Sequence, residues 1–178
     1  MNNTANRITL LRIALIPVFL VFMYLDLIYA ALTFYIIACV TDYIDGMVAR
    51  KYDQVTNFGK FMDPLADKLL VLSPMCYFTG TGVMPAWVVI IVLFREFAVS
   101  GLRLIAVEQD IVISAAVSAK VKTVVTMVAV GILIAINEPW MPFKSVLPAV
   151  CFALILATTL YSGVQYFVKY SSVLKNCN

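Results

Sequence analysis

The sequence predicts an all-α integral membrane protein, built as a bundle of six transmembrane helices. Its 178 residues are 63% hydrophobic and only 13% charged, and the mean hydropathy is +0.97, far above the value for a chain that faces water. Spans of about 20 residues with short connections leave room for about six helices and little else. We therefore expect a single membrane domain over residues 1–178.

Six apolar runs mark the expected helices, and the breaks between them carry turn residues. The segment 79–82 (TGTG) precedes Pro85, and the segment 137–142 contains two prolines. The first run carries Arg7 and Arg12 and lacks a cleavage-site pattern, so we expect a retained helix and not a signal peptide. The predicted helices are 8–25, 28–48, 58–78, 84–107, 113–136 and 146–168.

The positive charges predict how the chain crosses the bilayer. With the N-terminus inside, twelve of the thirteen Lys and Arg residues, all except Lys144, fall toward the inner side. Such a bias orients membrane proteins, and one missed helix would scatter the charges. We therefore expect both termini to lie in the cytoplasm.

The second and third predicted helices concentrate acid at the end that should face the cytoplasm. Asp42 and Asp45 lie one turn apart on the second helix, and Asp63 and Asp67 lie one turn apart on the third. The connection between these helices is short, which predicts antiparallel neighbours whose acidic stripes face each other. Asp53 lies in the connection and is expected to be solvated.

Four carboxylates at this depth require a cation between them, because like charges repel and are costly to remove from water. Oxygen donors without His or Cys favour a hard divalent cation such as Mg²⁺ or Mn²⁺. Four acids suit two such ions with bridging carboxylates, an arrangement that clamps a transferring phosphoryl group. The sequence contains no His and only four scattered Cys, so a zinc site is not expected.

The same stretch resembles the signature of the CDP-alcohol phosphatidyltransferase family. It reads D-x-x-D-G-x-x-A-R from Asp42 and G-x-x-x-D-x-x-x-D from Gly59, with eight residues between the two parts. The resemblance implies that an alcohol attacks the β-phosphorus of a CDP-linked lipid and that CMP leaves. It also implies a bacterial inner (plasma) membrane enzyme with a cytoplasmic active site, contact with membrane lipids, a homodimer and no nucleic-acid partner.

The resemblance further implies roles for individual residues. Asp67 would act as the general base that takes the proton of the alcohol. The metal ions would be held by Asp42, Asp45, Asp63 and Asp67, and the CDP group would be bound by Gly46, Arg50 and Gly59.

Four cations near the same membrane face are candidates for binding a phosphate on the acceptor alcohol. Arg95 and Arg103 belong to the fourth predicted helix, and Lys120 and Lys122 open the fifth. We favour Arg103 and Lys120, followed by Lys122 and Arg95; the alternative for each is snorkelling to the interface. Lys120 and Lys122 lie about 200° apart on a helix, so they cannot both point into one cavity. Arg95 is not expected to face the adjacent Glu96.

Other segments resemble those family members whose acceptor is sn-glycerol 3-phosphate, namely NRITLLRIALIP (6–17), TNFGKFMDPLADKLLV (56–71), REFAVSGLRL (95–104) and KVKT (120–123). Asn6, Thr9 and Arg12 match too, and they either edge the nucleotide pocket or cap and anchor the first helix. Inositol phosphate and phosphatidylglycerol are the alternative acceptors within the family. Outside it, a membrane prenyltransferase and a cation transporter are the competing classes.

Overall fold

The computed structural model describes residues 4–52, 57–108, 116–136 and 146–171, and its described side chains are those of 9–42, 62–107, 116–136 and 146–171. Within these ranges the chain is all-helical and contains no strand. The helices are α1 (Thr4–Tyr24), α2 (Ile28–Tyr52), α3 (Asn57–Gly80), α4 (Ala86–Glu108), α5 (Val117–Ile136) and α6 (Leu147–Lys169). The predicted all-α fold with six helices is confirmed, and the bounds differ from the predicted ones by at most four residues.

Tight turns connect α1 to α2 and α3 to α4. Asp26 follows α1 with a φ of 54°, and Gly82 follows α3 with a φ of 76°. Both angles are left-handed, a region that glycine enters freely and aspartate more readily than most residues. The amide of Leu27 donates to the carbonyl of Phe22 at 2.9 Å and closes the first turn. These turns reverse the chain, so consecutive helices run antiparallel.

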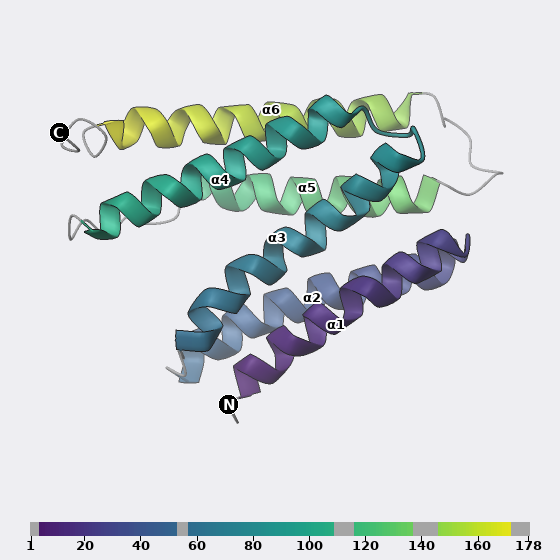
Figure 1. Cartoon of the computed structure of the whole chain (residues 1–178), viewed down its shortest axis with the longest axis horizontal. Coiled ribbons are helices and arrows are strands. Elements are labelled where there is room, and N and C mark those ends of the chain that lie inside the picture. The colour runs from purple at the N-terminus through teal and green to yellow at the C-terminus, as the bar shows by residue number, and fades with distance from the viewer. Residues whose placement is uncertain (1–3, 53–56, 109–115, 137–145, 172–178) are drawn as a thin grey trace.

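The antiparallel order brings one end of every helix to the same side of the molecule. The amino ends of α1, α3 and α5 lie beside the carboxyl ends of α2, α4 and α6 (Figure 1). α4, α5 and α6 run nearly alongside one another, α1 and α2 form a tilted pair, and α3 crosses between the two groups (Figure 1). α1 packs extensively on both α2 and α3. We call the shared side the charged end, because the acidic and basic residues singled out above belong to it.

A continuous apolar core runs between the helices and leaves the charged end polar. One buried side chain from each helix illustrates it: Phe19, Tyr35, Phe78, Val92, Leu133 and Ile155. Large apolar side chains also cover the outside of the bundle; Phe94 is 74% exposed and Val168 is 71% exposed. An outer surface this apolar is unusual for a protein that faces water.

Among the described residues, α5 and α6 are long and apolar enough to cross a membrane, and α1 and α2 contain the shorter apolar stretches Thr9–Tyr24 and Ile28–Asp42. α3 and α4 do not pass the same test. Each carries several charged residues, including Asp63 and Asp67 in α3 and Arg95 in α4. The charges that lower their hydropathy are the same charges that form the candidate site.

Candidate active site

Three acidic residues of the predicted set meet α1 at the charged end. The side chain of Arg12 is only 1% exposed, and its Nη1 atom lies 2.9 Å from Oδ1 of Asp42 and 2.6 Å from Oδ1 of Asp67. Thr9, one turn earlier on α1, donates its hydroxyl to Oδ1 of Asp63 at 2.7 Å. α1 thus supplies one cation and one hydroxyl to carboxylates of α2 and α3.

The carboxylates of α2 and α3 are therefore joined through α1. Their short connection had predicted only a direct contact between the two helices. Among α1, α2 and α3, the contact between α2 and α3 is the smallest. Arg12 provides positive charge where the carboxylates were expected to require it. Sequence reasoning gave Arg12 no such role, although an arginine inside an apolar helix is a signal that it has a buried partner.

The described side chains do not by themselves form a metal centre. No group of three or more His, Cys, Asp or Glu residues among them is close enough to hold a metal ion. Asp45, Gly46, Arg50 and Gly59 belong to α2 and α3, but their side-chain positions lie outside the described residues.

The donor chemistry does fit a hard divalent cation. Carboxylate oxygens of Asp42 on α2 and Asp67 on α3 converge on a single positively charged atom, Nη1 of Arg12. Oxygen donors of this kind are the ligands that Mg²⁺ and Mn²⁺ prefer. The residues present are therefore compatible with the expected ion.

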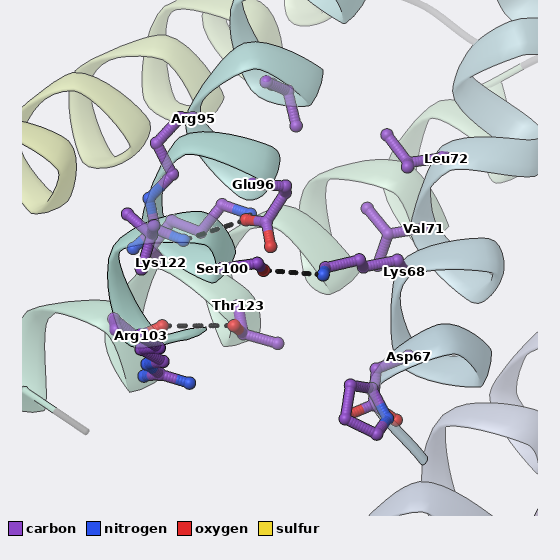
Figure 2. Close-up of a pocket in the computed structure, with 14 residues that line it drawn as sticks. Asp67, Lys68, Val71, Leu72, Arg95, Glu96, Ser100, Arg103, Lys122 and Thr123 are labelled. Carbon is purple, nitrogen blue, oxygen red and sulfur yellow. Dashed lines mark hydrogen bonds and ion pairs between the residues drawn. The ribbon is translucent and has the colours of Figure 1, made fainter. Parts of the chain in front are cut away.

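A cavity of about 210 Å³ with both polar and apolar lining lies beside Asp67, between α3, α4 and α5. Asp67 and Lys68 stand on its α3 side, and the charged residues of α4 and α5 stand opposite them (Figure 2). The polar and charged lining residues are Asp67, Lys68, Arg95, Glu96, Ser100, Arg103, Lys122 and Thr123. The cavity thus joins the expected general base to a group of cations.

Two of these cations are buried and share one carboxylate. Arg95 is 9% exposed and Lys122 is 5% exposed. Nη1 of Arg95 lies 2.9 Å from Oε1 of Glu96, and Nζ of Lys122 lies 2.5 Å from the same oxygen. The prediction that Arg95 would not face Glu96 is wrong, because the arginine side chain is long enough to bring Nη1 to the carboxylate of its neighbour in the sequence.

α6 supports Arg95 from behind the cavity. Nη2 of Arg95 donates to the hydroxyl of Ser162. At the adjacent Gly163, a Cβ atom would lie 3.3 Å from Cγ of Arg95, closer than most real contacts. A glycine at this position therefore leaves room for the arginine to pass between α4 and α6.

The other two cations are held by neutral hydroxyl groups. Nη2 of Arg103 donates to the hydroxyl of Tyr166 at 2.6 Å, and the guanidinium carbon lies 5.4 Å from the centre of that ring. Nζ of Lys68 donates to the hydroxyl of Ser100 at 2.8 Å. Neither bond neutralises the cation, so Lys68 and Arg103 keep their charge for an anionic ligand.

The structure separates the four predicted acceptor-binding cations by whether they line the cavity. Arg95, Arg103 and Lys122 line the cavity, whereas Lys120 is exposed and is not among the lining residues. The separation of about 200° between Lys120 and Lys122 explains why only one of them reaches it. The preference for Lys120 over Lys122 thus finds no support in the geometry.

Sequence reasoning missed Lys68, Glu96 and Ser100, which also line the cavity. A usable signal was present, because Glu96, Ser100 and Arg103 follow the spacing i, i+4 and i+7 and so form one polar stripe on an otherwise apolar helix.

Comparison with known proteins decides the family. The family model for CDP-alcohol phosphatidyltransferase matches residues 2–167. The chain belongs to this family. The resemblance carried by the acidic motif is thereby confirmed for nearly the whole chain.

Curated relatives agree with this assignment. A Bacillus subtilis (strain 168) protein named CDP-diacylglycerol–glycerol-3-phosphate 3-phosphatidyltransferase is 41% identical over 196 aligned residues, and the match covers 100% of both chains. A Mycobacterium tuberculosis (strain H37Rv) protein named probable phosphatidylglycerophosphate synthase is 36% identical, over 94% of this chain and 81% of that protein. A Rickettsia typhi protein with the same name as the Bacillus protein is 39% identical, over 75% of this chain and 77% of its own length.

Proposed function

We propose that this chain transfers the phosphatidyl group from CDP-diacylglycerol to sn-glycerol 3-phosphate, giving phosphatidylglycerophosphate and CMP. The observation that carries the proposal is that Asp67, Arg95, Arg103 and Lys122 line the same cavity. The names of the Bacillus and Rickettsia relatives describe the same transfer, and the Mycobacterium relative is named for the same product.

The cavity suits a small acceptor that carries both a phosphate and a hydroxyl. Its volume of about 210 Å³ is below the range of roughly 300–1,000 Å³ for drug-sized ligands. Guanidinium groups bind phosphate through paired, charge-assisted hydrogen bonds, and an ammonium adds a point charge. With the phosphate held by Arg103, Lys122 and Arg95, the other end of the acceptor would lie toward Asp67.

Asp67 acts as the general base in this proposal. Its carboxylate takes the proton of the acceptor hydroxyl, the hydroxyl oxygen bonds to the β-phosphorus, and the bond from that phosphorus to the oxygen of CMP breaks. Arg12 keeps Asp67 oriented through the 2.6 Å contact between Nη1 and Oδ1. Gly46, Arg50 and Gly59 are proposed to bind the CDP group, as the family motif implies.

Asp42, Asp45, Asp63 and Asp67 are the residues proposed to hold Mg²⁺ or Mn²⁺, with two ions in each site. When bound, the ions would neutralise the diphosphate and the departing phosphate of CMP. Arg12 would share the carboxylates of Asp42 and Asp67 with the metal. All four donors are carboxylates, which supports a hard divalent cation.

All six helices are proposed to cross the inner membrane of a bacterium as one domain over residues 1–178, with both termini and the charged end in the cytoplasm. The bias of twelve among thirteen Lys and Arg residues supports this orientation, and so does the apolar outer surface of the bundle. A cytoplasmic site would receive a water-soluble acceptor directly, while CDP-diacylglycerol stays in the lipid. Association as a homodimer is part of the proposal and rests on the family alone.

An acceptor panel tests the proposed function. Purified protein in detergent receives CDP-diacylglycerol, Mg²⁺ and one acceptor at a time: sn-glycerol 3-phosphate, inositol phosphate or phosphatidylglycerol. We expect CMP release with sn-glycerol 3-phosphate and a rate at least about tenfold lower with the other two. Release with another acceptor, without release with sn-glycerol 3-phosphate, would overturn the choice of substrate.

A further inference from the structure

Glu96 lines the cavity beside the cations, and it is the acidic lining residue to which the proposed function gives no role. It is a carboxylate on the wall that would hold the acceptor's phosphate, where a negative charge opposes binding of that group. Its side chain is only 17% exposed. A partly buried acid in an anion site requires an explanation other than phosphate binding.

Part of the explanation is visible in its contacts. Oε1 of Glu96 lies 2.9 Å from Nη1 of Arg95 and 2.5 Å from Nζ of Lys122. This oxygen fixes the positions of two buried cations and neutralises one of their two charges. Holding these cations, however, engages only one of the two carboxylate oxygens.

The second oxygen points into the cavity. Figure 2 shows Glu96 with one oxygen turned toward Arg95 and Lys122 and the other turned toward the open space in front of Lys68. Within the part of the chain that the structure describes, the hydrogen bonds and ion pairs of Glu96 all end on Oε1. Oε2 is therefore positioned to accept a hydrogen bond from a ligand, and an ionised carboxylate accepts such bonds strongly.

We propose that Glu96 determines specificity by accepting a hydrogen bond from the hydroxyl on the middle carbon of the acceptor. This inference rests on the proposed function, since it assumes an acceptor with a phosphate at one end and the attacking hydroxyl at the other. The attacking hydroxyl lies at Asp67 and the phosphate lies at Arg103 and Lys122. The middle of a three-carbon acceptor then lies between these two ends, in the space that Glu96 faces.

The pairing also explains why an acid is tolerated among the cations. A site built to bind a hydroxyl rejects an analogue that lacks it, because the site's own polar group is then buried without a partner. The same carboxylate repels inorganic phosphate more than it repels a polyol phosphate, because the hydroxyl of the polyol donates a hydrogen bond that offsets the repulsion. Glu96 would therefore select, among the small phosphate compounds of the cell, an acceptor whose hydroxyl is on the carbon next to the phosphate-bearing carbon.

The test compares two acceptors that differ only in the middle hydroxyl. These are sn-glycerol 3-phosphate and 3-hydroxypropyl phosphate, and CMP release gives kcat/KM for each with the wild-type protein, with Glu96→Gln and with the control Asp26→Asn. Gln keeps the size of Glu96 and removes its charge. Asp26 lies in the turn after α1, at the opposite end of the bundle, and its substitution removes the same charge.

We expect the wild-type protein and Asp26→Asn to prefer sn-glycerol 3-phosphate by about 10- to 100-fold, the range for a hydrogen bond to a charged group. In Glu96→Gln we expect this preference to fall at least about fivefold. An equal loss of kcat/KM for both acceptors in Glu96→Gln would overturn the inference, because Glu96 would then only hold its cations. Equal kcat/KM for both acceptors with the wild-type protein would also overturn the inference. This comparison needs no variant, so it holds even if Glu96→Gln fails to fold.

The result also separates this inference from the proposed function. Absence of CMP release by the wild-type protein with sn-glycerol 3-phosphate overturns the proposed function and this inference together. Normal release with a preference that Glu96→Gln leaves unchanged overturns this inference alone.

Discussion

Replacing Arg12 with methionine tests the contact between α1 and the acidic residues. The change removes one cation that lies 2.9 Å from Asp42 and 2.6 Å from Asp67. Methionine fills much of the same space, so the effect is mainly electrostatic. We expect a lower thermal stability, because two carboxylates then face each other without their shared counter-charge.

The size of the effect follows from burial. Breaking a fully buried ion pair costs about 3–5 kcal/mol, whereas a surface pair contributes about 0–1 kcal/mol. The Arg12 side chain is 1% exposed, but those of Asp42 and Asp67 are 27% and 44% exposed. We therefore expect a cost of about 2–3 kcal/mol, or a fall of roughly 4–12 °C in Tm for a chain of this size.

The assay is thermal unfolding in detergent, with and without Mg²⁺. Lys169→Met serves as the control, because Lys169 is an exposed cation in the last turn of α6. Mg²⁺ should stabilise Arg12→Met more than the wild-type protein, since the ion replaces the missing charge. A Tm within about 2 °C of the wild-type value, which corresponds to at most about 1 kcal/mol, together with an unchanged response to Mg²⁺, would refute the role given to Arg12.

Three further predictions concern the cavity and the base. Asp67→Asn should lower kcat by about 10²- to 10⁴-fold, as loss of a general base does, while circular dichroism still reports a folded helical protein; near-normal turnover would exclude Asp67 as the base. Lys122→Met should raise KM for sn-glycerol 3-phosphate at least about tenfold, whereas Lys120→Met should change it less than twofold; equal effects would contradict the separation of these two lysines. Gly163→Leu should displace Arg95 and raise KM for the acceptor severalfold, with a cost of about 1–3 kcal/mol in stability from overpacking; unchanged kinetics would mean that the position of Arg95 does not matter.

The helices were predictable because their signals are local. Apolar runs of near-membrane length, together with the turn residues at 79–82 and 137–142, locate all six helices to within four residues. The acidic residues could also be identified from one sequence, since carboxylates are rare in apolar helices and their spacing places them on one face.

The contacts of Arg12 and Glu96 could not be predicted in the same way. Arg12 meets Asp67 across 55 positions of sequence, and Lys122 meets Glu96 across 26. The periodicity of a sequence does not indicate that α1 packs on both α2 and α3, or that Lys122 of α5 reaches Glu96 of α4. The choice of Lys120 over Lys122 failed to find support for the same reason: helical spacing shows that the two lysines diverge, but only the packing of α5 shows which one turns inward.

The proposed function requires the cavity to bring an acceptor phosphate and Asp67 together for phosphatidyl transfer. The most direct measurement supplies purified protein with CDP-diacylglycerol, Mg²⁺ and carbon-13-labelled sn-glycerol 3-phosphate and identifies the lipid product by mass spectrometry. We expect labelled phosphatidylglycerophosphate in amounts equal to the CMP released, and formation of this product about 10²- to 10⁴-fold slower with Asp67→Asn. Release of CMP without label in any lipid would contradict it.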